Sequence, residues 1–239
     1  MLFSATTALL GLAATVLSAP VIGIQKRAVI AHDAVVGFAE TLPSGVTGTL
    51  YLKYKPYLKN DNGCVPFPAV DAAGNTGGGL APSGSSSGSC SSNTGQVYAR
   101  AGSYNGAYAI MYSWYWPKDS PSDGLGHRHD WESIVVWISE ASTTATLQGV
   151  AASAHGDFDT TTTPNLMSGT SRPLIRYYNV WPVNHQLGFT STVGGQQPLI
   201  AWESLPSAAR TALENTDFGD ANVPFKDSNF QNNLAKAAL

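Results

Sequence analysis

The stretch that decides the fold of this chain is residues 107–139, AYAIMYSWYWPKDSPSDGLGHRHDWESIVVWIS. In a β-strand, side chains two residues apart share a face, and the first half of the stretch follows this period. One face would collect Tyr108, Ile110, Tyr112, Trp114 and Trp116. The stretch therefore predicts two strands, Ala107–Trp116 and Trp131–Ser139, with Pro117 ending the first because proline cannot donate to a central ladder.

The rest of the chain has short runs rich in tyrosine, valine and isoleucine, bounded by Gly, Pro, Asn or Ser. Such runs are typical of an all-β sandwich or barrel. The further predicted strands are Thr47–Tyr54, Gln96–Ala101, Thr146–Ser153, Leu174–Val180 and Pro198–Trp202. Short helices are predicted for Asp33–Glu40, for Ser204–Glu214 and from Asp227 or Ser228 to the C-terminus. The sequence thus predicts a mainly β, single-domain β-sandwich with a few peripheral helices.

The loop between the two central strands should bring four polar side chains to one rim of the sandwich. Asp119 lies before the loop, and His127, Asp130 and Glu132 lie after it, within the heptapeptide GHRHDWE at residues 126–132. Three carboxylates and an imidazole suit a hard divalent cation such as Mg²⁺, Ca²⁺ or Mn²⁺. Zinc fits less well, since there is no helical HExxH pattern. A salt-bridge cluster around Arg128 and a metal-free acid/base site remain alternatives.

Other polar residues have assignments of their own. His129 should point opposite Asp130 and support the site from the core, and Arg128 should buttress the carboxylates. His155 and His185 each stand near a strand end and are candidates for ligand binding at the rim. Trp181, just after a predicted strand, is a candidate for contact with a sugar or a lipid headgroup.

The N-terminal residues predict secretion and processing. Residues 1–18 are uncharged and apolar and end in Val16-Leu17-Ser18, as in a signal peptide. Residues 19–27 would form a short pro-segment ending at the dibasic pair Lys26-Arg27, which leaves residues 28–239 as the mature domain. Cys64 and Cys90 are the only cysteines, and in an oxidising compartment they most simply form a disulfide.

Charge and hydropathy exclude two classes of partner. Removal of Lys26 and Arg27 takes the formal net charge from −3 to −5, so no basic field favours nucleic acid or anionic lipid. After the leader, no segment has the roughly 20 apolar residues that span a bilayer. We therefore expect no nucleic-acid partner and no integral membrane segment, and a membrane would have to be recognised by something other than bulk charge.

The segment from Ala109 to Glu132, with its GHRHDWE motif and the preceding Asp119, resembles the central region of the necrosis- and ethylene-inducing peptide 1-like proteins. The two cysteines in the N-terminal third resemble those of the type 1 members. The resemblance implies a β-sandwich similar to actinoporins and fungal lectins. It also implies that Asp119, His127, Asp130 and Glu132 hold a divalent cation, Mg²⁺ or Ca²⁺, partly through water.

The same resemblance implies a function. Proteins of this family are secreted cytolysins that bind glycosylinositol phosphoceramide sphingolipids of plant plasma membranes and permeabilise them, without being enzymes. A peptide corresponding to residues 109–132 is implied to engage a plant pattern-recognition receptor. Two alternatives stay open: a non-lytic glycan-binding or elicitor member, and a metal-assisted hydrolase in which Asp130 or Glu132 acts as a base.

Overall fold

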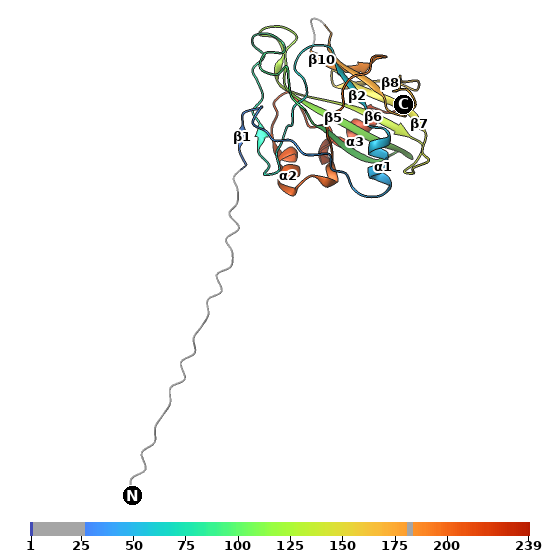
Figure 1. The fold of residues 1–239 in the computed structure, drawn as a ribbon, viewed down its shortest axis with the longest axis horizontal. Coiled ribbons are helices and arrows are strands. Elements are labelled where there is room, and N and C mark those ends of the chain that lie inside the picture. Colours follow the sequence, from blue (N-terminus) through green and yellow to red (C-terminus); the bar gives the residue numbers. More distant parts are fainter. Residues whose placement is uncertain (2–26, 181–183) are drawn as a thin grey trace.

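The computed structural model of this protein describes residue 1, residues 27–180 and residues 184–239. Its centre is a six-stranded sheet with the strand order β11-β4-β5-β6-β7-β8 (Figure 1). These strands are β4 (Val97–Tyr104), β5 (Ala107–Asp119), β6 (His127–Ile138), β7 (Leu147–Ala154), β8 (Asp157–Thr161) and β11 (Leu199–Ala201). The long antiparallel pair of β5 and β6 forms the middle of the sheet, as the 107–139 stretch predicted.

A second, three-stranded sheet packs on one face of the first. Its order is β10-β9-β2, with bounds β2 (Tyr57–Asn60), β9 (Leu174–Asn179) and β10 (His185–Phe189). Trp116 of β5 stacks on Tyr177 of β9, with 4.0 Å between ring centroids. Two sheets packed face to face make a β-sandwich, and the predicted mainly β fold class is confirmed.

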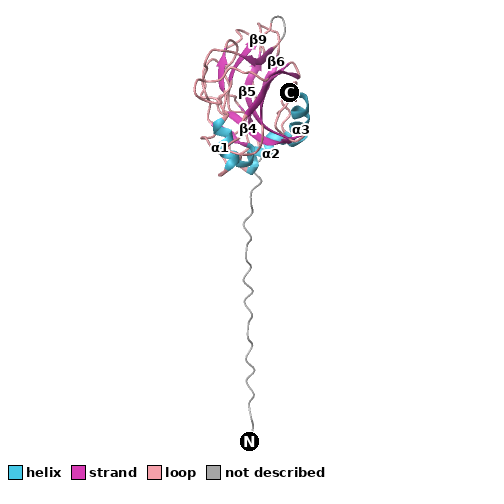
Figure 2. Cartoon of the chain, turned by 90° about the vertical axis from the view of Figure 1, so that its right-hand side faces the viewer, coloured by secondary structure: helices cyan, strands magenta, loops and turns pink. Residues whose placement is uncertain are grey.

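Helices pack against both faces of the large sheet. Tyr112 lies on the same face of β5 as Trp116, and its hydroxyl donates to the carbonyl of Tyr51, a helical residue, at 2.8 Å. The helices are α1 (Val46–Lys53), α2 (Ser207–Asn215) and α3 (Asp227–Lys236), and η1 (Trp202–Ser204) is a short 3-10 helix. Figure 2 shows α3 beside the strands, close to the C-terminus. The indole of Trp137 donates to the carbonyl of Ala237 at 2.7 Å, which ties the chain end to β6. A small parallel pair, β1 (Val29–Ile30) with β3 (Thr76–Gly77), completes the described elements.

One predicted strand is a helix. Thr47–Tyr54 was expected to be extended, but Val46–Lys53 is α1. Leu50, Tyr51 and Tyr54 of this segment are buried at helical spacing, and the Tyr54 hydroxyl donates to the carbonyl of Ala145 at 2.7 Å. Burial against the rest of the sandwich therefore overrides the strand preference of this aromatic segment.

The predicted helices had mixed outcomes. Asp33–Glu40 is not helical, because its backbone is held in an irregular path in which Phe38 donates its N–H to the Gln96 side chain at 2.6 Å. The second helix starts later than predicted: Pro206 precedes α2, and Ser204 belongs to η1 rather than capping a helix. The terminal helix is confirmed as α3, with Phe230 and Leu234 buried.

Strand β5 continues past Pro117, contrary to the expectation that proline would end it. The register of β5 on β6 shifts between Trp116 and Lys118, and Lys118 faces both Arg128 and His129. Such a bulge absorbs a residue that cannot join the ladder. The pairing then resumes, and it places Asp119 directly opposite His127.

The predicted disulfide is present between Cys64 and Cys90, which are 26 residues apart in sequence. Next to it, Val65 donates its N–H to the carbonyl of Cys90 at 2.9 Å. The bridge closes the loop that contains the Gly/Ser-rich segment. Among the described residues, no helix is both long and apolar enough to cross a bilayer.

Candidate functional site

A cavity of about 840 Å³ lies at an open edge of β6. Strand β7 pairs with β6 only from Ile134 and Ala152 onward, so residues 127–133 of β6 have no strand on that side within the described part of the chain. The ladder ends where the Ser153 hydroxyl accepts the N–H of Ser133 at 2.9 Å and donates to the Glu132 carboxylate. A side chain thus replaces the backbone partner, and the gap beside β6 becomes the cavity.

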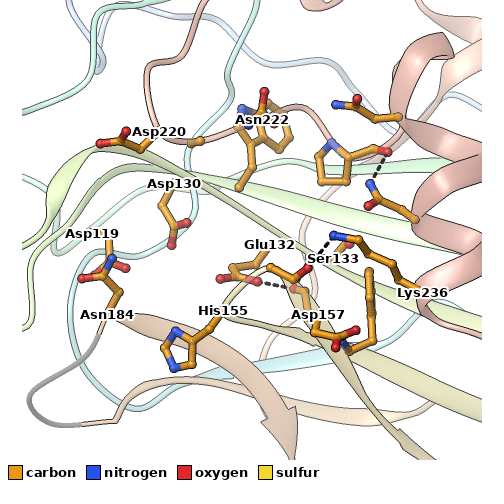
Figure 3. A pocket seen from close by; sticks show the side chains of 18 of the residues that line it. Asp119, Asp130, Glu132, Ser133, His155, Asp157, Asn184, Asp220, Asn222 and Lys236 are labelled. Carbon is orange, nitrogen blue, oxygen red and sulfur yellow. Dashed lines mark hydrogen bonds between the residues drawn. The ribbon is translucent and has the colours of Figure 1, made fainter.

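Three buried carboxylates line this cavity. Asp119, Asp130 and Glu132 are only 1%, 5% and 8% exposed. Burial raises the pKa of Asp130 well above its usual range, and the neighbouring Asp119 charge raises it further. Burial followed by the charge of Asp130 does the same to the pKa of Glu132. In Figure 3, Asp130 and Glu132 lie along the same strand, between Asp119 on one side and Asp157 on the other.

His185 holds Asp119 in place. Its Nδ1 donates to Asp119 Oδ1 at 2.6 Å, and its backbone N–H donates to Oδ2 at 2.9 Å. Both side chains are buried, so this pair is shielded from water. The sequence-predicted ligand-binding residue His185 therefore lies at the cavity as a partner of a carboxylate.

Tyr177 holds Asp130 in the same manner, and sequence reasoning had not selected it. Its hydroxyl donates to Asp130 Oδ2 at 2.8 Å. Its ring is stacked between Trp116 at 4.0 Å and His185 at 4.7 Å. These three stacked rings join the large sheet to the small one. No local pattern in the sequence indicates a contact between residues so far apart in the chain.

His127 faces Asp119 across the mouth of the loop. Gly126 has a φ of +98°, and a Cβ at this position would lie 2.1 Å from the carbonyl oxygen of Asp119, so only glycine lets the two strands approach here. His127 Nδ1 donates to the carbonyl of His129 at 2.7 Å. The other ring nitrogen, Nε2, lies 4.0 Å from Asp119 Oδ2.

His129 and Arg128 lie away from the carboxylates. His129 packs against Tyr115, whose hydroxyl lies 2.6 Å from Nδ1. Burial, followed by the charge of Arg128, lowers the pKa of His129 to about 4, so this imidazole is neutral at pH 7. Arg128 was expected to buttress the carboxylates, but its guanidinium donates to the carbonyl of Gly78 at 2.8 Å, and within the described part of the chain no ion pair joins it to an acid. The bulge turns Arg128 outward and removes the basis for a salt-bridge cluster centred on it.

The structure brings His155 to the same cavity and leaves Trp181 undescribed. His155 and Gly156 have φ values of +51° and +85° and form the two-residue turn between β7 and β8, the backbone twist that such hairpins favour. His155, Asn184 and His185 all line the cavity. Trp181, the predicted membrane contact, lies outside the described residues.

The donor set is compatible with a hydrated hard cation. Burying three carboxylates together is unfavourable unless positive charge or protons offset it, and Mg²⁺ is commonly held by one or two carboxylates while it keeps several waters. As the side chains stand across residues 27–180 and 184–239, no group of three or more acidic, histidine or cysteine residues is arranged to hold a metal ion. The residues that the sequence predicts as ligands are Asp119, His127, Asp130 and Glu132.

Sequence comparison connects the chain to one family. A family profile described as "Necrosis inducing protein (NPP1)" matches residues 48–237. The chain is 50% identical over 227 residues to NLP effector protein 10 of Phytophthora capsici, covering 93% of this chain and 97% of that protein. It is 49% identical over 222 residues to the necrosis-inducing protein NPP1 of Phytophthora nicotianae, covering 90% and 93% of the two chains.

Solved structures with the same fold include ligand complexes. NLPPya in complex with mannosamine superimposes with a TM-score of 0.84 at 51% identity, covering 89% of this chain and all of that one. NLPPya with glucosamine superimposes with a TM-score of 0.83 at the same identity and coverage. A structure described as "Toxin fold as basis for microbial attack and plant defense" also gives a TM-score of 0.84 at 51% identity, covering 89% of this chain and all of that one.

Proposed function

The chain belongs to the necrosis-inducing protein family, which includes toxins as well as a protein described as non-toxic, and from this premise we propose that it is a secreted cytolysin. Its target would be the sugar headgroup of glycosylinositol phosphoceramide sphingolipids in plant plasma membranes. Binding would depend on a divalent cation, Mg²⁺ or Ca²⁺, and would lead to permeabilisation. The observation that carries the proposal is the cavity in which Asp119, Asp130 and Glu132 are buried together.

The carboxylates would serve binding through their fixed positions. His185 and Tyr177 hold Asp119 and Asp130 by hydrogen bonds, so neither acid has to be ordered when a ligand arrives. Asp119, His127, Asp130 and Glu132 would hold the cation, which when bound neutralises the acids and offers coordination sites to hydroxyl oxygens. Asn184 and His155, at the margin of the same cavity, would donate to or accept from the sugar.

The ligands seen with NLPPya support a carbohydrate target. Mannosamine and glucosamine are amino sugars, and the protein that binds them covers nearly nine tenths of this chain at 51% identity. The cavity here is lined by five acids, Asp119, Asp130, Glu132, Asp157 and Asp220. An uncharged or cationic sugar suits such walls better than an anionic one.

The proposed action is binding rather than catalysis. One relative is described as an effector and one solved structure as a toxin fold, and effectors of plant pathogens act outside the producing cell, which supports secretion through the predicted leader. The segment 109–132 would serve in addition as the ligand of a plant pattern-recognition receptor.

Dye release from vesicles tests the proposal. Vesicles with plant glycosylinositol phosphoceramide should release their dye in the presence of Mg²⁺ or Ca²⁺, and leakage should stop with chelator or when the glycolipid is replaced by phosphatidylcholine. Binding without leakage would instead identify a non-lytic sugar binder. Release of soluble products from plant polymers without leakage would identify a hydrolase.

A further inference from the structure

The cavity extends beyond the carboxylates, around the open edge of β6, to the C-terminal helix. In the view of Figure 3, Asp119 and Asn184 lie at one end, and Asp157 and Lys236 lie at the other. The first end faces the small sheet, because Tyr177 of β9 bonds to Asp130 there. The second end is walled by α3 and by the loop at residues 220–224.

This second end, here called the helix-side half, consists of Phe158, Asn222, Asn232 and the backbone of Trp131. All four residues line the cavity. Asn222 and Asn232 are exposed, and their amides offer both donors and an acceptor, while Phe158 is half-buried and offers an aromatic face. A few polar groups beside an aromatic surface are what a sugar ring with hydroxyls and C–H bonds can use.

The strand edge adds backbone groups to the helix-side half. Ser133 directs its N–H toward β7, where the Ser153 hydroxyl accepts it. In a strand, residues two apart direct their backbone groups to the same side, so the N–H and C=O of Trp131 also face the unpaired edge. The N–H of Trp131 hydrogen-bonds the Asp130 carboxyl group, so the C=O of Trp131 is the backbone group that can accept a hydrogen bond from a sugar hydroxyl.

The walls of the helix-side half are held before any ligand binds. Asn229 and Asn233 of α3 donate to the carbonyls of Val223 and Pro224 at 3.0 Å and 2.9 Å. Lys236, at the end of α3, donates across to the carbonyl of Gly156 at 2.7 Å. The helix, the 220–224 loop and the β7–β8 turn are therefore connected around the space, which lowers the ordering cost of binding.

The volume points to more than one sugar ring. Pockets of roughly 300 to 1,000 Å³ hold drug-sized molecules, and a cavity of about 840 Å³ lies near the upper end of that range. We propose that the helix-side half is a second sugar subsite, which binds the neighbouring pyranose of the same oligosaccharide whose first ring sits beside the carboxylates. This inference rests on the proposed function, since it takes the headgroup sugar to be the ligand.

Calorimetric titration with two probes tests the second subsite. The probes are glucosamine, which can fill one subsite, and the oligosaccharide released from the headgroup of plant glycosylinositol phosphoceramide. Asn232→Ala and Phe158→Leu should each raise the Kd of the oligosaccharide by about three- to tenfold, the effect of losing one modest contact. The Kd of glucosamine should not change. Gln231→Ala, on the same helix but outside the cavity lining, is the matched control and should alter neither Kd.

The outcomes separate this inference from the proposed function. If wild-type protein binds the oligosaccharide and the two variants bind it equally well, the second subsite is wrong and the proposed function stands. If the variants raise the Kd of glucosamine as much as the Kd of the oligosaccharide, the helix-side half holds the first ring, and the inference is overturned. If wild-type protein binds neither probe, the proposed function itself fails. Thermal melts accompany each titration, and Phe158→Leu keeps an apolar side chain so that folding is retained.

Discussion

Asp130 and Glu132 are acids buried beside other acids, and this conflict sets the chemistry of the cavity. Burial and mutual repulsion raise the pKa of both groups. Either protons or a cation must offset the buried charge. The same side chains that lower the stability of the cation-free protein should therefore give it affinity for a cation.

Asp130→Asn should stabilise the protein in chelator while it abolishes cation binding. The amide oxygen can still accept the Tyr177 hydroxyl, but the repulsion with Asp119 and Glu132 is gone, so the free energy of unfolding should rise by about 1 kcal/mol. Thermal melts with EDTA and with Mg²⁺ measure both effects. Asp159→Asn, an exposed acid on β8, is the control and should change neither melt. A lower melting temperature of Asp130→Asn in EDTA would contradict the prediction.

Tyr177→Phe should weaken Mg²⁺ binding by roughly tenfold, the lower end of the loss seen when a partner of a metal ligand is removed. The ring stack with Trp116 and His185 would remain, so stability should change little. Tyr178→Phe is the matched control, since its ring packs under Arg176 at 3.9 Å and its hydroxyl accepts from Gln186, away from the carboxylates. Calorimetric titration with Mg²⁺ measures the difference, and equal affinities for the two variants would remove the role given to Tyr177.

Among the elements, the β5–β6 pair carries both the core and the site. From Ile110 to Trp116, the side chains of β5 are almost entirely buried, and the same pair brings Asp119 opposite His127. The bulge at Pro117 lets β5 continue past a proline. Gly126 lets the chain pass close to the backbone of Asp119. The site therefore depends on the central element of the fold.

The disulfide should contribute stability by restraining the unfolded chain. Cys64→Ser together with Cys90→Ser should lower the free energy of unfolding by about 3 to 4 kcal/mol, less any strain, because the bridge closes a loop of 26 residues. Urea unfolding compares the double variant with wild type. Equal urea midpoints for the double variant and the wild type would show that the bridge adds no stability. Peptide mapping under non-reducing conditions checks that both cysteines are bonded to each other.

A synthetic peptide of residues 109–132 should elicit ethylene production in plants able to sense it. In the folded protein, Tyr112, Trp114 and Trp116 of this segment are buried, so a receptor that reads the linear sequence needs the peptide or unfolded protein. Protease-treated protein should therefore act at lower concentrations than folded protein. A scrambled peptide is the control. If the true peptide elicits no ethylene in responsive plants, this segment has diverged from the sequence that the receptor recognises.

For the whole molecule, recognition must be local because the formal net charge is only −3 and no basic field draws the protein to a membrane. The cavity opens beside the start of β10, where Asn184 and His185 line it. Val180, which precedes Trp181, is 37% exposed. The end of β9 and the start of β10, which are paired at Asn179 and His185, therefore lie at the rim that carries the cavity.

Trp181→Ala should reduce vesicle lysis strongly while it changes stability little. An indole at a lipid interface contributes apolar contact, whereas truncation of a buried tryptophan typically costs about 3 to 5 kcal/mol. One thermal melt and one leakage assay separate these cases. Val193→Ala, an exposed apolar residue elsewhere, is the control. A variant that still lyses vesicles but has lost several kcal/mol would place Trp181 in the core.

Local patterns in the sequence were enough to predict the central strands and the acids of the cavity. Alternation with a period of two identifies the faces of β5 and β6 without reference to the rest of the chain. Asp119, His127, Asp130 and Glu132 were placed together because a short loop joins two neighbouring antiparallel strands. Each of these inferences depends on residues close in sequence, where spacing alone defines geometry.

Only the tertiary structure decided what these acids touch. Tyr177 reaches Asp130 across 47 residues, and His185 reaches Asp119 across 66. Packing of the two sheets creates those contacts, just as burial of Leu50 and Tyr54 turned a predicted strand into α1. The wall formed by α3 has the same origin. Contacts of this kind depend on which surfaces exclude water together, and a period read along one segment carries no information about the surface that will cover it.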